Sequence, residues 1–467
     1  MKLTGLLFAA ALLGSCTQPA AEENYTRHVD PKIGTGGHGH VFVGANVPFG
    51  LVQVGPTSIP QTWDWCSGYH ASDSTVIGFS HTHLSGTGIG ELFDGTVMPV
   101  TGEVTYARGE EADPASGLWS YADRTQEIAR PGYYSVPLTR YGIRAELTAT
   151  ARVGLHRYTF PASEKAAVVF DLENGGCWDK ATETHLAKEG DRTVTGWRHS
   201  TGWAKDQRVY FVAEFSKPFE KFETIGDNYA RASFRTTDGE QVSLKVALSP
   251  VSVEGARENL AAELPGWDFE ETAKAADKAW NAELSKVKIE TADETARRIF
   301  YTALYHTMIA PSLFCDVNGD YYGSDHAIHR NADFTNYTTF SLWDTYRAAM
   351  PLMTVLHPEK MADIVQTMLH IADEQGRLPV WHLWGNETDC MVGNPGIVAV
   401  ADAIVKGIGG FDREKAFEAI RKTAMNPDRG NGLRMEYGYI PCEMFNEAVA
   451  YDMEYALADG AAARAAE

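Results

Sequence analysis

Cysteine is scarce in this chain, which has six in 467 residues and no Cys-x-x-Cys pair. Structural zinc sites and thiol redox motifs need paired cysteines at that spacing, so the sequence gives no support for either kind of site. If a leader ending before Cys16 is removed and Cys16 is acylated, five cysteines remain, and an odd number leaves at least one thiol outside any disulfide. The sequence does not assign any disulfide pairing.

Basic side chains are also few compared with acidic ones. The chain has 41 Lys and Arg against 62 Asp and Glu, a formal net charge of -21 at pH 7. Nucleic acids and anionic membrane surfaces would repel such a chain at long range, so neither is expected as a partner. A neutral ligand suits this charge better.

The apolar run at the N-terminus is short. It extends from Leu6 to Leu13, follows Lys2 and leads into Leu13-Gly14-Ser15-Cys16. A run of this length cannot span a bilayer. It resembles a bacterial lipoprotein signal, cut before a Cys16 that is then acylated, with a plain secretory signal as the alternative. We therefore expect residues 1–24 to be signal and tether of a secreted, periplasmic or cell-surface lipoprotein of a Gram-negative bacterium, touching membrane only through its lipid.

The chain is too long for one ordinary core, because single cores stop growing near about 250–300 residues. Residues 25–264 contain short alternating or apolar segments separated by Gly, Pro, Asp and Asn, a pattern typical of strands. We predict an N-terminal antiparallel β-sandwich whose strands include 144–150, 153–160, 166–172, 209–215 and 242–248.

Helical spacing replaces this pattern near Trp267, and we expect a helical linker over 265–290. Residues 291–467 then predict successive capped helices of a partial (α/α)6 barrel. The helices are expected to start at the capping box Thr291-Ala-Asp-Glu294, Pro358, Asn394-Pro395, Asp412 and near Glu443. Since the chain stops at ALADGAAARAAE without a closing cap, we expect a C-terminally truncated barrel, hence a fragment.

An unusual density of Gly, His and Trp lies between Ile33 and Glu91, in IGTGGHGHVFVGANVPFG, WDWCSGYH and GFSHTHLSGTGIGE. Glycine lets the backbone approach a ligand closely, while Trp and His offer flat faces with a polar tip. This composition is typical of sugar-binding clefts and makes carbohydrate the first substrate class to test.

Two histidine pairs in this block, His38-Gly-His40 and His81-Thr-His83, would each place two imidazoles on one face of a strand. Zinc or copper could be held that way. Because no carboxylate or Cys stands at ligand spacing along the sequence, loop packing and sugar contact are the favoured interpretation.

The blocks IGTGGHGH…VPFG, WDWCSGYH…GFSHTHLSGTG, SLWDTYR, GNETDCMVG and GYIPCEMFNEAVA, in this order, resemble glycoside hydrolase family 92. Members of that family are calcium-dependent, inverting exo-α-mannosidases. The resemblance implies a β-sandwich, a helical linker and an (α/α)6 barrel, with removal of terminal α-mannose from N-glycans or mannans. It also implies Ca²⁺ as cofactor, with Asn446 as a candidate ligand.

Glu447, in FNEAVA, falls where the family carries its general acid. An inverting glycosidase needs one protonated carboxyl for the leaving oxygen and one carboxylate to activate water. The resemblance places the base in a later part of the barrel, after Glu467. A glutamate that only caps a helix is the alternative for Glu447.

Several other polar or aromatic residues are candidate substrate contacts. By resemblance, Asp344 in SLWDTYR would hydrogen-bond the sugar in the -1 subsite, with a helix N-cap as the alternative. Trp63 is expected to form a platform on the sandwich side, whereas Trp65 is expected in the core, both rings pointing the same way from an extended segment. The remaining candidates are Tyr69, His70, Asn386, Glu387 and Asp389, the last two with a solvated loop as an equal alternative.

Two other functions compete with a mannosidase. The first is a non-catalytic glycan-binding surface lipoprotein derived from such an enzyme. The second is a different sandwich-plus-barrel enzyme, such as a glycoside phosphorylase or a glucoamylase-like hydrolase, against which WDWCSGYH and SHTHLSGTG argue. The linkage that is cut and the oligomeric state are not predicted.

Overall fold

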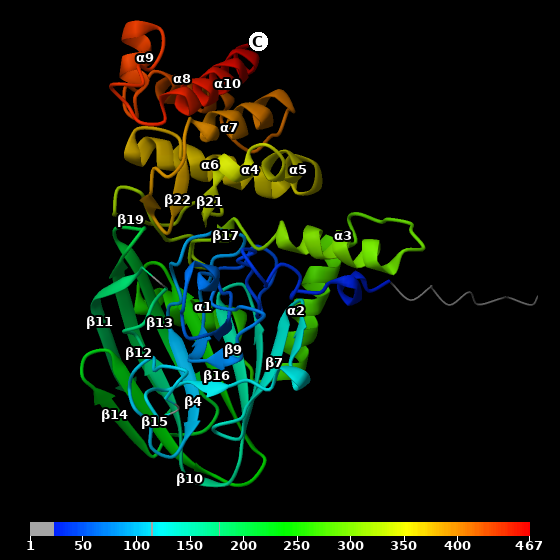
Figure 1. Cartoon of the computed structure of the whole chain (residues 1–467), viewed down its shortest axis with the longest axis vertical. Coiled ribbons are helices and arrows are strands. Elements are labelled where there is room, and N and C mark those ends of the chain that lie inside the picture. The colour runs from blue at the N-terminus through cyan, green and yellow to red at the C-terminus, as the bar shows by residue number, and fades with distance from the viewer. Residues whose placement is uncertain (1–22, 114, 177) are drawn as a thin grey trace, which may run out of the picture.

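The computed structural model describes residues 23–113, 115–176 and 178–467, so Cys16 and the predicted signal lie outside the described residues. The chain forms a β domain at one end and a helical domain at the other (Figure 1). No helix in the described ranges has both the length and the apolar character needed to cross a bilayer.

The β domain consists of two large antiparallel sheets. The six-stranded sheet has the order β1 (Gly55–Thr57), β3 (Gly78–Ser80), β4 (Thr96–Thr101), β10 (Ser163–Asp171), β15 (Tyr229–Thr236) and β14 (Lys221–Ile225). The eight-stranded sheet has the order β11 (Lys180–Glu189), β12 (Thr193–Thr201), β13 (Gln207–Phe215), β16 (Glu240–Ser249), β9 (Val153–Phe160), β8 (Ile143–Ala149), β7 (Tyr133–Leu138) and β6 (Ile128–Arg130).

The two sheets face each other across one apolar core, as the alternating sequence pattern predicts. The ring of Phe170 on β10 stacks on Phe211 of β13 at a centroid distance of 6.2 Å and meets Phe215 edge-on. All three rings are buried. The five predicted strands correspond to β8, β9, β10, β13 and β16, and the predicted sandwich is confirmed.

Two helices cover the outer face of the eight-stranded sheet (Figure 1). They are α1 (Val253–Glu263) and α2 (Phe269–Leu284), which supply Ala256, Leu260, Phe269 and Ala273 to a cluster with β9, β13 and β16. The sheet is therefore buried on both sides at this point. The segment predicted as a helical linker contains α2, and α1 lies within the range expected to be strands.

The helical domain contains α3 (Glu294–His306), α4 (Leu342–Thr345), α5 (Ala349–Leu356), α6 (Pro358–Gln375), α7 (Pro395–Val405), α8 (Arg413–Ala424), α9 (Asn431–Tyr437) and α10 (Ala448–Ala466). Short strand pairs lie between α3 and α7: β17 (Ser312–Leu313) with β20 (Tyr337–Thr338), β18 (Tyr321–Tyr322) with β19 (Ile328–His329), and β21 (Phe340–Ser341), β22 (Trp381–Leu383) and β23 (Asn386–Glu387) as a three-stranded sheet. In Figure 1, α7, α8 and α10 stack beyond α4, α5 and α6.

Local chemistry explains most helix ends. Pro358 opens α6 and Asp412 caps α8 with its carboxylate, both as predicted, and Gly376 closes α6 in the left-handed conformation. The capping box at Thr291 is wrong: Asp293 is the N-cap of α3, because its carboxylate accepts the amides of Thr295 and Ala296. The last helix begins at Ala448 rather than near Glu443, since residues 441–447 form turns, and α9 was not expected.

The core is continuous across the boundary between the domains. Tyr322, Trp381 and Trp384 of the helical domain belong to the same buried cluster as the sandwich interior. In the other direction, Tyr25 and Phe49 of the N-terminal segment pack into the core of the helices. The boundary is therefore a packed interface, and side chains at its rim are held in place from both sides.

Candidate functional site

Three of the recognised motifs meet at the start of α10. Trp343 of SLWDTYR, Val392 of GNETDCMVG and Phe445 of FNEAVA pack into one small apolar cluster with Tyr451 of α10. Glycine is needed at position 393, where φ is +80° and an added Cβ would come 2.5 Å from Cβ of Glu454. The motifs are thus distant in sequence but adjacent in space.

Ion pairs reinforce this convergence. Glu454 of α10 accepts a hydrogen bond from the hydroxyl of Tyr346 at 2.7 Å and pairs with Arg347 at 2.7 Å. Both partners stand directly after Asp344 in SLWDTYR, so α4 is fixed to α10. The sequence reasoning missed Tyr346, Arg347 and Glu454, although the first two lie within a motif that it quoted.

Glu447 is the residue immediately before α10, and its side chain is exposed. It occupies the N-cap position with φ of 57°, a left-handed conformation that few residues other than glycine adopt. Its carboxylate makes no capping hydrogen bond. A purely capping role, the alternative considered for this glutamate, therefore has no support from the geometry, and the carboxylate faces solvent at a point where strain is retained.

The pKa of the Cys390 thiol responds to both candidate carboxylates. The thiol is half-buried, and burial is the main cause that raises its pKa, with smaller contributions from the negative charges of Asp344 and Glu447 and an opposing one from Arg429. Charges must lie near the thiol to act on it in this way. The negative charges of Asp344 and Glu447 therefore act on the pKa of the same thiol.

Asp344 lines a cavity of about 270 Å³ between the two domains. One wall is the loop Ser85-Gly86-Thr87 of the β domain, and the other comes from α3, α4 and α5, including His306, Met350 and Met353. The hydroxyl of Ser341, the N-cap residue of α4, donates to the Asp344 carboxylate. Asp344 itself is exposed and lies within the first turn, so the N-cap alternative for this residue is wrong.

Trp63 lies beside the same loop. Its ring is 49% exposed, its indole N–H donates to the carbonyl of Gly88 at 2.8 Å, and His40 meets it edge-on at 4.2 Å. A side chain on Gly88 would strike the indole, which explains the glycine. Trp63 is therefore an exposed aromatic ring that its contacts hold in place next to loop 85–87.

The expectation that Trp63 and Trp65 point the same way from an extended segment is wrong. Residues Trp63–Trp65 form one turn of 3₁₀ helix, so successive side chains diverge. Trp65 is half-buried, stacks on His70 at 4.3 Å and donates to Asp73 at 2.7 Å. These contacts pack Trp65 against the β domain, but it does not reach the core as expected.

Tyr69 and His70 are not part of the cavity lining. Tyr69 is buried, and its hydroxyl donates to Glu127 at 3.0 Å beneath the guanidinium of Arg124. His70 is buried against Trp65, with Nδ1 2.7 Å from the hydroxyl of Ser72. Their contacts hold the β domain together behind the Trp63 turn, and neither residue closes a wall at Asp344.

Asn386, Glu387 and Asp389 also serve structure in this conformation. Asn386 is buried and exchanges two hydrogen bonds with the backbone of Asp206 in the β domain, at 3.0 and 2.9 Å. Glu387 accepts the amides of Val380 and Trp381, at 2.8 and 2.9 Å, so it is not a solvated loop residue.

Asp389 is exposed and pairs with Arg377 and Arg429. Arg429 in turn donates to the carbonyl of Gly393 at 2.6 Å. These charges brace the loop that carries Cys390. The sequence identified the three residues as polar, but it could not show that their polar atoms already bond other parts of the protein.

The two histidine pairs do not lie on strands, so that expectation is wrong. His81 and His83 follow β3 and are fully buried, and each Nδ1 bonds a backbone carbonyl, of Gly95 at 2.7 Å and of Gln53 at 2.8 Å. Burial lowers the pKa of His81 to about 4 and that of His83 to about 3, so both rings are neutral. His38 and His40 instead flank Asp64, whose carboxylate lies 2.5 Å from His38 Nδ1.

Within the described ranges, three metal-ligating side chains gather at Asp325, His329 and Glu374. The imidazole lies 3.1 Å from Asp325 and 3.4 Å from Glu374, distances that hydrogen bonding explains. An imidazole is also a poor ligand for calcium, which takes oxygen. Asn446, exposed beside Glu447, and Asp344 offer oxygen donors of the type that calcium prefers.

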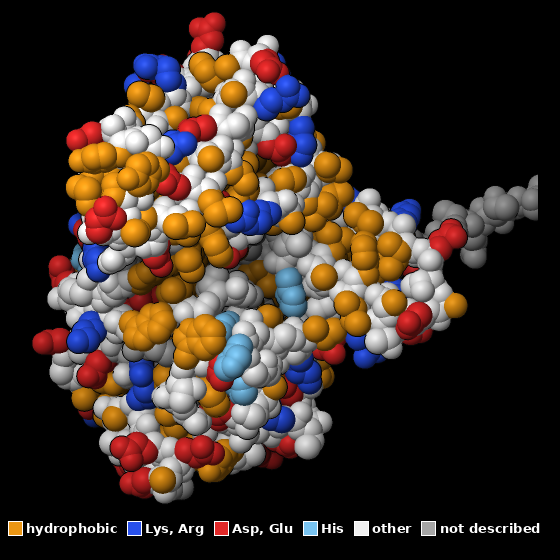
Figure 2. All heavy atoms as spheres, turned by 45° about the horizontal axis from the view of Figure 1, so that its top comes forward, with side chains coloured by type: hydrophobic (Ala, Val, Ile, Leu, Met, Phe, Trp, Pro, Cys, Tyr) orange, Lys and Arg blue, Asp and Glu red, His pale blue; other side chains and the backbone are white. Residues whose placement is uncertain are grey.

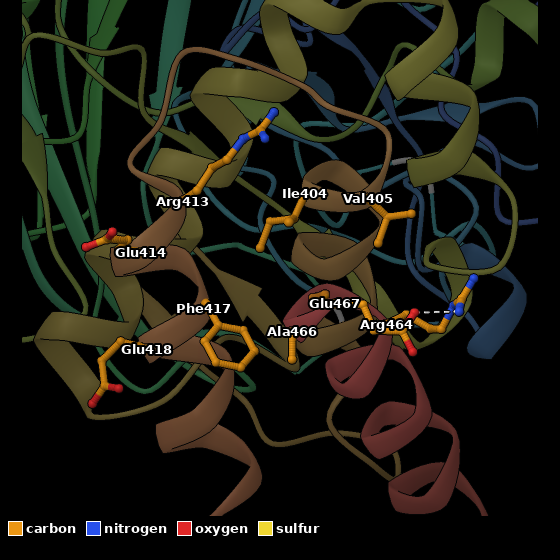
Figure 3. A pocket seen from close by; sticks show the side chains of 10 residues that line it. Ile404, Val405, Arg413, Glu414, Phe417, Glu418, Arg464, Ala466 and Glu467 are labelled. Atoms are coloured by element: carbon orange, nitrogen blue, oxygen red, sulfur yellow. Dashed lines mark hydrogen bonds and ion pairs between the residues drawn. The ribbon is translucent and has the colours of Figure 1, made fainter.

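A larger cavity of about 630 Å³ opens between α7, α8 and the end of α10 (Figure 3). Phe417 and Ile404 give it an apolar floor, and the pair Arg464–Glu467 closes one side. It contains none of the recognised motifs. The cleft between the domains, by contrast, appears in Figure 2 as a hollow with histidine and hydrophobic side chains around it. We therefore take the interdomain cavity as the candidate site.

Comparison with protein families gives two adjoining matches. Residues 28–249 match the glycosyl hydrolase family 92 N-terminal domain, and residues 255–467 match the glycosyl hydrolase family 92 catalytic domain. The boundary between the two matches coincides with the change from β16 to α1.

Similar proteins point the same way. A family 92 α-mannosidase from Bacteroides thetaiotaomicron, solved in complex with mannoimidazole, is 38% identical with a TM-score of 0.91 over 95% of this chain and 61% of its own. A family 92 inverting mannosidase from the same organism is 28% identical with a TM-score of 0.84, over 95% of this chain and 62% of its own. An uncharacterised secreted glycosidase of Arthroderma benhamiae is 26% identical over 94% of this chain and 58% of its own length. The chain thus spans about three-fifths of the length of these relatives.

Proposed function

Since this chain belongs to glycosyl hydrolase family 92, we propose that it acts on mannose-containing glycans as an exo-α-mannosidase that inverts the anomeric carbon. The observations that carry the proposal are the packing of SLWDTYR, GNETDCMVG and FNEAVA into one apolar cluster at the start of α10, and the position of Asp344, from the first of these motifs, in the lining of the interdomain cavity. The similarity to an inverting mannosidase supports the stereochemical part.

Glu447 is proposed as the general acid. Hydrolysis of a glycoside by inversion requires a carboxyl that protonates the leaving oxygen. Glu447 is exposed, makes no capping hydrogen bond, and is held in a strained backbone conformation at the start of a helix that one hydrogen bond and one ion pair fix to α4. It is therefore available to a substrate at a fixed position.

Asp344 and Trp63 are proposed to bind the sugar in the -1 subsite. The Asp344 carboxylate retains an oxygen for hydroxyl groups while Ser341 orients the other, and Trp63 presents its face beside loop 85–87. A cavity of about 270 Å³ accommodates one hexose unit, in keeping with removal of terminal residues. We assign the water-activating base to no residue of this chain.

Calcium is proposed as the cofactor, because the oxygen donors of Asp344 and Asn446 suit a hard cation. When bound, it would supply positive charge that grips ring hydroxyls and favours a distorted sugar. Asn446, by its position beside Glu447, would hold it.

The proposed location is outside the cytoplasm, as a surface or periplasmic lipoprotein anchored through Cys16. Two observations support it: the leader resembles a lipoprotein signal, and a relative is described as a secreted glycosidase.

The test compares two classes of α-mannoside, one with an alkyl leaving group and one with a dinitrophenyl leaving group that needs no protonation. Glu447→Gln is expected to lower kcat/KM on the alkyl mannoside by about 10²-fold or more, the usual worth of a general acid, and much less on the aryl substrate. Glu443→Gln, an exposed glutamate four residues earlier, is the matched control and should change neither rate.

Equal losses on both substrates would contradict the role of Glu447. If the wild-type chain binds mannoimidazole saturably and hydrolyses neither mannoside in the presence of calcium, the glycan-binding alternative replaces the enzymatic one.

A further inference from the structure

Four charged side chains are buried together around Arg198 of β12. They are Glu91, Asp94, Asp179 and Arg198, each no more than 8% exposed. Arg198 donates to Asp94 at 2.9 Å and uses both terminal nitrogens on Asp179, while its Nε donates to the carbonyl of Leu172 at 2.9 Å. Two of the three carboxyl groups therefore pair with the guanidinium, and its Nε bonds a backbone carbonyl.

Glu91 is the carboxyl group left without a cation. Its Oε1 accepts the amide of Ala204 at 3.1 Å, and its Oε2 has no hydrogen-bond partner. A Cβ on Gly202 would come 2.4 and 2.6 Å from the two oxygens, so the carboxyl group lies against the backbone of residues 202–204.

The remaining groups around Glu91 do not compensate a negative charge. Asp94 is further bonded by the neutral side chains of Gln207 and Thr82, at 2.6 and 2.8 Å. Arg108 donates to the carbonyl of Gly175 at 2.9 Å, and Lys205 lies at the surface, 3.3 Å from the carbonyl of Gly202.

Three buried carboxylates would therefore face one guanidinium, which is costly unless one carboxyl stays neutral. Burial, with Asp179 and Asp94 adding to it, raises the pKa of Glu91 to about 8.

The segment that Glu91 holds leads directly to the candidate site. Trp203, next to Ala204, meets Trp381 of the helical domain edge-on at 4.6 Å. Trp381 pairs with Ser341 across β21 and β22, and the hydroxyl of Ser341 donates to Asp344. Four contacts therefore connect Glu91 to the carboxylate at the cavity: Glu91 with Ala204, Trp203 with Trp381, Trp381 with Ser341, and Ser341 with Asp344.

We propose that Glu91 is a positioning residue: its uncharged carboxyl group holds residues 202–206 against the helical domain, and its ionisation releases that segment and displaces Asp344. The role of Glu91 in stabilising the fold does not depend on the proposed function. The effect on ligand affinity rests on the proposed function.

The first experiment follows urea unfolding of the wild type and Glu91→Gln from pH 5 to 9. The pKa of Glu91 is raised above its ordinary value of 4.5, so between those two values the folded state keeps a proton that the unfolded state has lost. Stability therefore falls as pH rises through this window, by up to about tenfold in the unfolding equilibrium constant per pH unit, and levels off above pH 8. Glu91→Gln should lack this slope.

The second experiment measures hydrogen exchange of residues 202–206, corrected for the intrinsic dependence on pH. Protection in the wild type should fall between pH 7 and 9, and Glu91→Gln should keep it. Asp316→Asn is the matched control, since Asp316 is also buried but lies against Ser249 and Asn259, with its pKa raised to about 6 by burial. It should leave this exchange profile unchanged.

Parallel stability and exchange profiles in wild type and Glu91→Gln would overturn the proposal. If that variant does not fold, infrared spectra of the wild type decide: a protonated carboxylic acid band must be present at pH 7 and disappear as the pH passes 8, and its absence at pH 7 refutes the idea. Mannoimidazole affinity should weaken over the same range only in the wild type. Failure to bind at any pH contradicts the proposed function, while the exchange profile still decides the role of Glu91.

Discussion

Replacing Asn386 by Ala tests whether this buried amide joins the two domains. The side chain makes three hydrogen bonds: it accepts the amide of Asp206 at 3.0 Å and donates to the carbonyls of Asp206 and Trp384 at 2.9 and 2.8 Å. A typical net contribution is about 1 kcal/mol per bond, so Asn386→Ala should lower the free energy of unfolding by about 3 kcal/mol.

Asn394→Ala provides the matched control. Asn394 is also buried, but its side-chain amide makes one long hydrogen bond, of 3.5 Å, to the carbonyl of Thr423. Its loss should cost about 1 kcal/mol or less. Urea unfolding at pH 7 compares the two, with the denaturant slope required to stay constant so that the midpoints report stability alone. Equal costs for the two variants, or a cost for Asn386→Ala below about 1 kcal/mol, would refute the assignment of Asn386 as an interdomain tie.

Two further predictions concern packing and charge. Gly393→Ala should destabilise by about 2 kcal/mol more than Gly376→Ala in the same urea assay: both glycines are left-handed, at φ of 80° and 89°, but an added Cβ meets Glu454 only at position 393 and open space at 376. Equal losses of unfolding free energy in the two variants would show that α10 moves without cost to make room for the added Cβ. Burial alone would raise the pKa of Glu283, but hydrogen bonds from His357 and Lys286 outweigh it and hold the pKa at about 2. Its pairing therefore stabilises the fold fully above pH 4.5 and is lost as the pH falls towards 2, so Glu283→Gln should cost at most about 3 kcal/mol at pH 7 and little at pH 2; a constant cost across this range would contradict the pairing.

Most of the architecture could be predicted from the sequence, because it follows from hydrophobic periodicity and from the residues that start and end helices. Alternating strands such as β9 bury one face, and α6 is bounded by Pro358 and Gly376, each with a local physical reason. Where two neighbouring residues could both cap a helix, the sequence did not show which of them does so in the folded protein. Thr291 and Asp293 are both good caps, and the carboxylate that reaches two amides is the one used.

The candidate site could be predicted only in part, because the type of a polar residue does not reveal whether its atoms already have hydrogen-bond partners within the protein. Asp344 and Trp63 are exposed and remain candidates, while Tyr69 and Glu387 have partners far along the chain or across a turn. The left-handed backbone of Glu447 and the three carboxyl groups around Arg198 arise from tertiary packing and leave no pattern in the sequence.

The packing of the N-terminal segment into the helical core sets an order of events during synthesis. The amide of Tyr25 donates to Asn281, 256 residues further along the chain. At a synthesis rate of about 5–20 residues per second, the partner emerges roughly 10–50 seconds later. The residues around Tyr25 must therefore stay exposed until the whole sandwich has been synthesised, because their binding partner on α2 does not exist before then.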